Sequence, residues 1–400
     1  MAKVFVVSEY VYSAQNSTGY FWSKVIDKAG LAFSALRVVS PVPTEQGCYK
    51  SEVSGVKYVE FYSKKFNKSN LISRLLGQAW QCMGFSRHII GSTGRGDIVL
   101  SGTNPALLLF LIPIIKLFIG FRWCLLVHDV FPENLVPAGV LKKNSFPYRA
   151  LRKLFNLIYS RADHIIVIGR DMKELIAEKT GGDANITVIQ NWVSDRDVSP
   201  ESRDESEIIN QLCWQDRVVF QFFGNIGRVQ GVDNILDAIK LVKSPRAAFL
   251  FIGDGTAAES VREFINAYPK DNVAYIGPMA QSRKNLGLAA CDVALITLEK
   301  GMLGLGVPSK AYFSMAADRP LLAVMESTAE ISRMIHEDAI GWSCAPSDPA
   351  ALAALIDDIC QQDLSSMRGH TRKVLQEKYS EAIALDKFIA CINSVAEIKK

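Results

Sequence analysis

The stretch of this chain best suited to holding a charged ligand is a glycine-rich turn near its middle. The apolar run 218–223 is followed by Gly-Asn-Ile-Gly-Arg-Val-Gln-Gly at 224–231, and then by apolar residues at helical spacing. A strand, a glycine-rich turn and a helix place backbone N–H groups and a helix N-terminus at a strand end, where a diphosphate is stabilised. The spacing is not Gly-x-Gly-x-x-Gly, so the dinucleotide fingerprint is not matched. A turn whose glycines only permit tight packing is the alternative.

Further glycine-containing turns follow strands in the same half. Gly253-Asp254-Gly255 ends one apolar run and Gly277-Pro278 ends another. The segment 301–310, Gly-Met-Leu-Gly-Leu-Gly-Val-Pro-Ser-Lys, follows a third run and leads into a predicted helix. Small residues at carboxyl strand ends suit a ligand of an open α/β sheet, and the ammonium group of Lys310 would oppose a diphosphate charge. A plain surface turn is the alternative for segment 301–310.

Ionisable residues also follow a strand in the first half. The predicted strand 123–128 delivers His128-Asp129-Val-Phe-Pro-Glu133. A histidine and carboxylates emerging there fit hydrogen bonding to a sugar, or proton transfer. His128 could equally be a histidine satisfied within the core. The turn 13–19, rich in Ser, Thr and Gly, follows the first strand and is expected at the same edge.

These turns need parallel sheets to position them, and the apolar pattern predicts two. Short β-branched runs alternate with helical stretches along nearly the whole chain, which indicates two α/β domains. The segment 194–215 is dense in Ser, Asp, Glu and Arg, a composition typical of a linker. Residues 352–398 are predicted to form helices. The predicted strands are 4–8, 98–101, 123–128, 164–168, 187–189, 218–223, 248–252, 273–276, 293–297 and 320–324.

Composition excludes several classes of protein. The chain has 400 residues, with 45 Lys and Arg against 41 Asp and Glu, and its basic residues are scattered, which argues against a nucleic-acid-binding protein. Its eight cysteines form no CxxC pair, so neither structural zinc nor a disulfide framework is expected. The N-terminal apolar run is too short for a signal peptide, which favours a cytoplasmic protein.

One apolar stretch, residues 106–121, bears on membrane contact. Pro113 and Lys116 interrupt it, so it falls short of the roughly 18 to 20 apolar residues of a membrane span. It is predicted to be either a buried or half-buried helix, or a helix that dips into one leaflet, with a true span the least favoured alternative. Lys116, Arg122, Lys142 and Lys143 would suit contact with anionic lipid.

Taken in order, these motifs resemble the family 4 glycosyltransferases, which are retaining enzymes that use nucleotide sugars. The resemblance is greatest to the bacterial branch that builds O-antigen, colanic acid and capsule and that includes N-acetyl-fucosamine transferases. Each motif is short, and their common order over about residues 4–385 carries the resemblance. The matching motifs are Thr18-Gly19, His128-Asp129-x-x-Pro132-Glu133, Asn191-Trp192-Val193, Gly224-Asn225-x-Gly227-x-x-Gln230-Gly231, Gly253-Asp254-Gly255 and Val307-Pro308-Ser309-Lys310.

The chain departs from the family at the residues that meet the donor diphosphate. Many members have an Arg and a Lys where this chain has Asn225 and Gln230. We therefore expect Arg228, Lys310 and backbone N–H groups to meet the phosphate charge.

A second departure concerns two glutamates, eight residues apart, that many members carry. The corresponding positions here resemble Leu305 and Phe313, so the usual carboxylate for the donor ribose is missing. Either Glu299 or Glu326 substitutes for it, or the nucleotide is held differently. The branch resembled here often lacks the first of these glutamates, so its loss does not imply an inactive protein.

The resemblance implies the GT-B fold, an α/β architecture of two Rossmann-like domains whose parallel sheets face each other across a cleft. An acceptor-binding domain is expected at 1–193 and a donor-binding domain at 194–375, with a C-terminal helix at 376–400 crossing back to the first domain. The implied site residues fall into three groups. They are His128, Asp129 and Glu133 as catalytic residues; Thr18 and Gly19 for the acceptor; and Gly224, Asn225, Gly227, Arg228, Gln230, Gly253, Asp254, Gly255, Gly277, Gly306, Val307, Pro308, Ser309 and Lys310 for the donor.

The implied activity is transfer of an N-acetylated hexosamine or deoxyhexosamine from a UDP-sugar, with retention, onto a lipid-linked saccharide. A polyprenyl diphosphate-linked acceptor, peripheral contact with an anionic membrane, no metal and no cofactor beyond the nucleotide sugar are expected. Two rival functions stay open. One is a non-catalytic partner that binds sugar nucleotides, and the other is a sugar-nucleotide 2-epimerase with the same fold and donor site.

Overall fold

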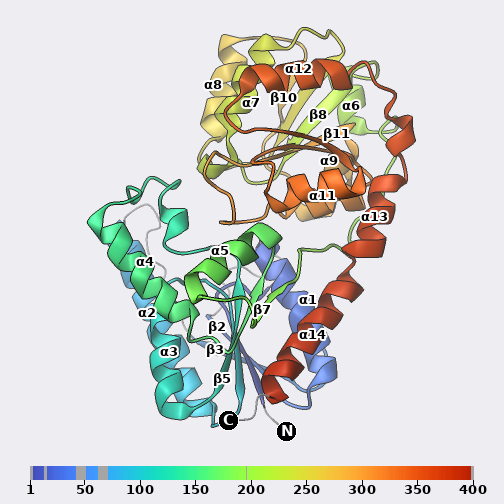
Figure 1. The fold of residues 1–400 in the computed structure, drawn as a ribbon. Helices are drawn as coiled ribbons and strands as arrows, with labels where there is room; N and C mark the ends of the chain where they lie inside the picture. Colours follow the sequence, from blue (N-terminus) through green and yellow to red (C-terminus); the bar gives the residue numbers. More distant parts are fainter. Residues whose placement is uncertain (1–2, 13–15, 42–50, 62–70, 195, 398–400) are drawn as a thin grey trace. The chain divides into compact units, whose positions relative to one another are not determined.

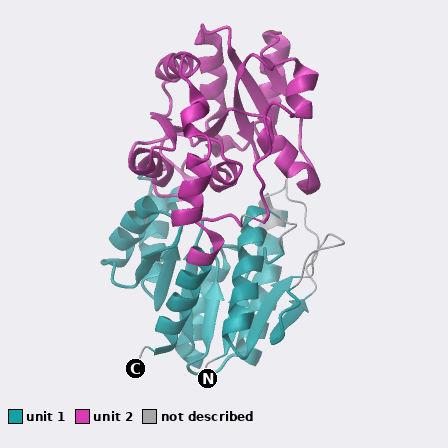
Figure 2. Cartoon of the chain, turned by 90° about the vertical axis from the view of Figure 1, so that its right-hand side faces the viewer, with its two compact units in different colours: residues 1–133, 143–190, 384–400 teal, residues 134–142, 191–383 magenta. Residues whose placement is uncertain are grey.

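The computed structural model describes residues 3–12, 16–41, 51–61, 71–194 and 196–397. The chain forms two compact units, shown in different colours in Figure 2. Unit 1 comprises Met1–Glu133, Lys143–Gln190 and Ala384–Lys400, and unit 2 comprises Asn134–Lys142 and Asn191–Ile383. Most of the last helix, α14 (Glu381–Glu397), therefore belongs to unit 1, where Lys28 of α1 (Ser17–Ala32) pairs with Asp386 at 2.7 Å.

Unit 1 is built on a sheet of seven parallel strands in the order β3-β2-β1-β4-β5-β6-β7 (Figure 1). Its strands are β1 (Val4–Val7), β2 (Leu36–Pro41), β3 (Val56–Phe61), β4 (Ile98–Ser101), β5 (Arg122–Val127), β6 (His164–Val167) and β7 (Ile186–Val188). Its other helices are α1 (Ser17–Ala32), α2 (Leu71–Ser92), α3 (Leu108–Ile119), α4 (Phe146–Tyr159) and α5 (Arg170–Thr180).

Unit 2 repeats the plan with six parallel strands in the order β10-β9-β8-β11-β12-β13. The strands are β8 (Val218–Phe223), β9 (Ala247–Ile252), β10 (Val273–Tyr275), β11 (Val293–Thr297), β12 (Leu321–Val324) and β13 (Gly341–Cys344). The helices are α6 (Glu207–Leu212), α7 (Val232–Leu241), α8 (Ala258–Ala267), α9 (Lys284–Ala289), α10 (Lys310–Ala316), α11 (Glu330–Asp338), α12 (Pro349–Ile359) and α13 (His370–Lys378).

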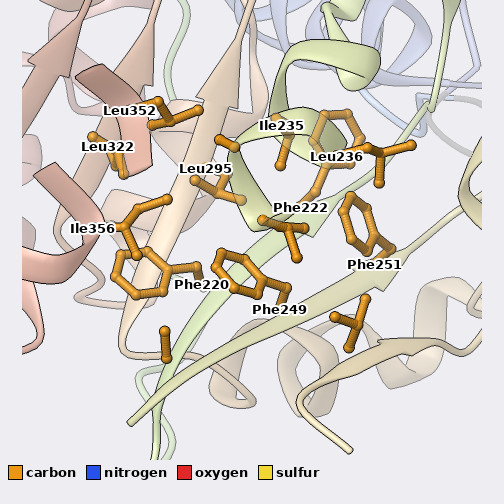
Figure 3. Packing of buried hydrophobic residues seen from close by; sticks show 14 of the residues in the cluster. Phe220, Phe222, Ile235, Leu236, Phe249, Phe251, Leu295, Leu322, Leu352 and Ile356 are labelled. Atoms are coloured by element: carbon orange, nitrogen blue, oxygen red, sulfur yellow. The ribbon is translucent and has the colours of Figure 1, made fainter. Parts of the chain in front are cut away.

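Aromatic side chains on neighbouring strands form the core of unit 2 (Figure 3). Phe220 and Phe222 of β8 stack on Phe249 and Phe251 of β9, with ring centroids 5.7 and 6.3 Å apart. Strands covered on both faces read as continuous apolar runs, which is why β8 and β9 carry almost no polar residue. Because β8 and β9 are packed in this way, the loops that follow them begin at fixed positions.

The ten predicted strands are all present, each within one residue of its expected bounds at either end. The prediction that segment 194–215 is a linker is wrong. Val198, Ile209 and Trp214 are buried within unit 2, and Ser206 caps α6 by accepting a hydrogen bond from the Ile209 N–H group. The many charged residues of segment 194–215 made its composition resemble a linker, although its few apolar residues attach it to the sheet.

Candidate functional site

The donor residues predicted from the sequence lie at the carboxyl edge of the second sheet. The chain leaves β8 toward β9 and β10 on one side, and the later strands β11 to β13 build the other side. Such a reversal of strand order creates a crevice between the loops of the two central strands, where open α/β sheets bind ligands. Loops 224–231 and 298–309 follow these two strands, so both predicted donor loops flank this point.

Two of the predicted glycines allow direct contact between backbones. The Gly224 N–H group donates to the Ile252 carbonyl at 2.9 Å, and the Ile226 N–H group donates to the Asp254 carbonyl at 2.9 Å. A Cβ atom on Gly253, whose φ is +138°, would lie 1.8 Å from the Gly224 carbonyl oxygen. One on Gly255 would lie 2.5 Å from the Ile226 oxygen. These two glycines are therefore required for loop packing, whatever else the loops bind.

The same glycine-rich turn is also tied to the loop after β11. The Glu299 N–H group donates to the Val229 carbonyl at 2.9 Å, and the Thr297 hydroxyl donates to the Gln230 carbonyl. Gly231, with φ +60°, begins α7 without a side-chain cap. Gly231 thus leaves the first N–H groups of α7 without a capping side chain of its own, and N–H groups at a helix start can bind an anion.

The remaining donor candidates lie around this turn. Arg228 and Asn225 are exposed, Gly227 is buried, and the Asp254 carboxylate accepts a hydrogen bond from the Gly255 N–H group at 2.8 Å. Gly277 accepts from the Gly253 N–H group at 2.8 Å. The half-buried residues that lead into α10 are Gly306, Val307, Pro308 and Ser309.

Lys310, the first residue of α10, is the most unusual group at this edge. Its Nζ atom lies 3.6 Å from the centre of the buried Phe222 ring. Although the residue as a whole is only partly buried, Nζ itself is shielded from solvent and has no hydrogen-bond partner. Burial lowers the pKa of this amine to about 7. A buried ammonium group facing no anion is costly, and an anionic ligand would relieve that cost.

Three further polar side chains at this edge have buried atoms without partners. They are Oε1 of Gln230, both amide atoms of Asn234 and Oε2 of Glu326. The other Glu326 oxygen accepts from the Gly301 N–H group at 2.8 Å. Unsatisfied buried polar atoms are rare in folded proteins, so a group of them at a strand edge indicates a ligand site. The sequence analysis did not predict Asn234 as a site residue. It could have done so, because an amide side chain in the first helical turn after a glycine-rich loop is well placed to meet a ligand of that loop.

In unit 1, His128 and Asp129 follow β5 at the carboxyl edge of the first sheet. Burial lowers the pKa of His128 to about 4, so its imidazole is neutral at neutral pH. Burial also raises the pKa of Asp129, while a hydrogen bond from Asn104 lowers it. The Asp129 N–H group donates to Thr103 at 3.3 Å. Thr103 and Asn104, at the end of β4, were not singled out by the sequence, which gives no sign of this long-range pairing.

Glu133, the third predicted catalytic residue, is held by two cations. Its two carboxylate oxygens accept from the Lys179 Nζ atom at 2.7 and 2.8 Å, and Arg152 lies 3.1 Å from one of them. The Lys179 side chain has no exposed surface. A carboxylate bound in this way ties α4, which carries Arg152, to α5, which carries Lys179.

The predicted acceptor residues Thr18 and Gly19 lie in the first turn of α1. Asn16 caps this helix by accepting from the Gly19 N–H group at 2.8 Å. A Cβ atom on Gly19 would lie 2.0 Å from the Tyr12 carbonyl oxygen, so packing alone requires glycine there. Thr18 is partly exposed. Residues 13–15 of the predicted turn lie outside the described residues.

The described residues contain no group of three His, Cys, Asp or Glu side chains arranged to hold a metal ion. They also contain no helix with the length and hydropathy of a membrane span.

Comparison with known proteins places this architecture in a family. Residues 217–362 match the family described as "Glycosyl transferases group 1". The chain is 53% identical to the "Probable glycosyltransferase WbjE" of Pseudomonas aeruginosa, over the full length of both chains.

The fold of the chain is similar to that of Anabaena Alr3699/HepE in complex with UDP, with a TM-score of 0.71, 13% identity and coverage of 98% of this chain and 100% of the other. It is also similar to WaaG, a glycosyltransferase involved in lipopolysaccharide biosynthesis, with a TM-score of 0.68, 11% identity and coverage of 96% and 98%. The predicted fold class is confirmed, and the chain belongs to the group 1 glycosyltransferases with the GT-B fold.

Proposed function

We propose that this glycosyltransferase moves a sugar from a UDP-sugar to a lipid-linked saccharide during synthesis of a bacterial surface polysaccharide. The proposal includes family 4 membership, retention of the anomeric configuration, and an N-acetylated hexosamine or deoxyhexosamine as the donor sugar. The named roles of two structural neighbours support it, since HepE was solved with UDP and WaaG acts in lipopolysaccharide biosynthesis.

The observation that carries the donor proposal is the unpartnered ammonium group of Lys310. A UDP diphosphate at the strand edge would meet this cation, the exposed Arg228 and the uncapped start of α7. Hydrogen bonds to charged groups contribute about 1.5 to 3 kcal/mol each. We assign Oε2 of Glu326, rather than Glu299, to hydroxyl groups of the donor, because this oxygen is buried and has no hydrogen-bond partner.

The proposed reaction uses no protein nucleophile and no divalent metal. The acceptor hydroxyl oxygen forms a bond to the anomeric carbon as the bond from that carbon to the diphosphate oxygen breaks. The departing diphosphate oxygen takes the hydroxyl proton on the same face. The protein then supplies position and positive charge. A neutral His128 fits a role as hydrogen-bond partner of the donor sugar, and Asp129 is assigned to the acceptor.

The proposed acceptor is a saccharide carried on polyprenyl diphosphate. A substrate of this kind lies in the membrane, so the enzyme would work in the cytoplasm at the inner face of the plasma membrane, as a peripheral protein. Unit 1, expected to bind the acceptor, would make the contact with lipid.

Thermal unfolding with UDP, GDP and dTDP and their sugars is the first test. A ligand at 100 times its dissociation constant adds about 2.7 kcal/mol to the free energy of unfolding, so UDP should raise the melting temperature and GDP should not. Transfer from the stabilising UDP-sugar to a polyprenyl diphosphate-linked saccharide is then measured, with product stereochemistry by NMR. Binding without transfer to any lipid-linked acceptor would favour a non-catalytic partner. An epimerised or free sugar formed without acceptor would favour a 2-epimerase.

A further inference from the structure

Unit 1 carries an apolar groove lined by none of the residues predicted to bind the donor or acceptor or to act in catalysis. The groove lies between α3 and α4 and has a volume of about 570 Å³. Phe110, Ile114 and Leu117 line it from α3, and Leu154 and Leu157 line it from α4. Because an exposed apolar surface of this kind is costly in water, it marks an interaction site.

The helix α3 is half-buried. One face packs into unit 1 through Leu108, Leu109, Ile112 and Ile115. The other face leaves Leu117 77% exposed and Phe118 82% exposed. Of the alternatives that the sequence left open, the structure therefore supports a half-buried helix with an apolar outer face.

The helices on this side of unit 1 carry basic residues and no acidic ones. The helix α3 packs against both α2 and α4, and the sequences of all three lack Asp and Glu, although the chain has 41 acidic residues. Arg149, Lys153 and Arg161 are exposed, and none pairs with a carboxylate in the part of the chain that the structure describes. Cations beside an apolar groove suit a partner that is both apolar and anionic.

Two cations that the sequence assigned to membrane contact have other roles. Lys116 pairs with Asp163 at 2.6 Å, and Arg122 donates to the Ala396 carbonyl oxygen in α14. The charge available for a partner therefore comes from α4 and from Arg161, two residues past its end.

We propose that the groove between α3 and α4 takes one hydrocarbon chain of an anionic membrane lipid, while the cations along α4 contact the lipid head groups. This docking surface would place unit 1 at the leaflet that carries the acceptor, and in that sense it rests on the proposed function. A bilayer is favoured over a protein partner because the two helices that form the groove are apolar and basic and carry no acidic residue of their own. The nearby carboxylates Asp163 and Glu178 already pair with Lys116 and Arg152.

Flotation of the full chain with vesicles of phosphatidylcholine alone, or with added phosphatidylglycerol, tests this surface. The protein should float with the anionic vesicles at low salt and less at about 0.5 M salt, because screening shortens the reach of the charges. Leu117→Ser should lower the partition coefficient at least tenfold, since burying a leucine side chain is worth about 1.5 to 3 kcal/mol. Lys153→Gln should lower it about fivefold.

Two controls make the test specific. Leu31 on α1 is 75% exposed, so Leu31→Ser matches Leu117→Ser in exposure and should leave flotation unchanged. Leu157→Trp fills the groove and adds apolar surface, so it should weaken flotation if a chain enters the groove. Stronger flotation of this variant would overturn the groove assignment.

Other results would also overturn the proposal. Protein that stays at the bottom of the gradient with anionic vesicles would overturn it. A dimer in solution that the Leu117→Ser substitution dissociates would also overturn it, because the surface would then bind a second copy of the chain. A rise in melting temperature with UDP, measured without vesicles, depends on the donor site alone. A chain that binds UDP but no vesicle would therefore contradict the docking surface and leave the proposed function standing.

Discussion

Each unit buries the ammonium group of a lysine near an aromatic ring, and the two lysines differ in what lies opposite them. Lys179 in unit 1 lies 5.6 Å from the Tyr159 ring centre and is bonded to both oxygens of Glu133. Lys310 in unit 2 lies 3.6 Å from the Phe222 ring centre and has no hydrogen-bond partner. Burial lowers the pKa of both amines, but only Lys179 has a carboxylate that opposes the shift.

The difference separates a structural charge from a charge that needs a ligand. A buried ion pair is complete within the fold, and removing one partner leaves a charge uncompensated. A buried cation without a partner is a cost to the free protein that a bound anion can offset.

Glu133→Gln should give the largest loss of stability, about 3 to 5 kcal/mol, because it leaves the Lys179 ammonium group buried without an anion. Urea unfolding measures it. Glu178→Gln is the matched control, since Glu178 also pairs with Arg152 but is exposed, and it should cost less than about 1 kcal/mol. Equal losses of unfolding free energy in the two variants would show that Glu133 has no special structural role.

Gly253→Ala should destabilise unit 2 by about 2 to 4 kcal/mol and weaken UDP binding, because the new Cβ atom forces loops 224–226 and 253–255 apart. Gly277 also has a positive φ, of 75°, but a Cβ atom there would meet nothing within 4 Å. Gly277→Ala should therefore cost only about 1 kcal/mol of backbone strain. Chemical unfolding and UDP titration compare the stability and UDP affinity of the two variants. Similar losses in both would contradict the close approach of the two loops.

His128 should make stability depend on pH. Its pKa falls from 6.5 to about 4 on folding, so between these values the unfolded chain binds the proton more tightly. The free energy of unfolding should drop as the pH falls through this window, by no more than about 1.4 kcal/mol per pH unit. His128→Asn should flatten the slope, while a change at the exposed His336 should not. An unaltered slope in His128→Asn would show that this imidazole is not held neutral.

The sequence predicts the strands well where burial on both faces makes the run apolar throughout. The bounds of β4, β8 and β11 are those of their apolar runs. The strands β3 and β13 were missed because they lie at sheet edges and mix polar residues with apolar ones. β2 was also missed, although it is largely buried, because its apolar run is short.

For the candidate site, the sequence could predict the loops but not the pairing of their side chains. The glycine spacing predicts the turn after β8, and the sequence assigns Lys310 to the donor, an assignment that stays a prediction. The pairing of Glu133 with a lysine 46 residues away depends on how α5 packs, which no local pattern encodes. The same holds for the unpaired oxygen of Glu326, whose position relative to Gly301 follows from the order of β11 and β12.

Calorimetric titration of UDP into the native chain and into Lys310→Met, with the free energy of unfolding of each, measures what the buried amine of Lys310 contributes to diphosphate binding. Because the pKa of Lys310 is about 7 in the free protein, binding at pH 8 should draw a proton onto its amine, and the affinity should fall as the pH rises above 7. Lys310→Met should abolish the proton uptake and lower the affinity at least tenfold, while stability stays equal or rises. Lys300→Met, at an exposed lysine of the same loop, should change none of these. Unchanged affinity and proton uptake in Lys310→Met would contradict the account.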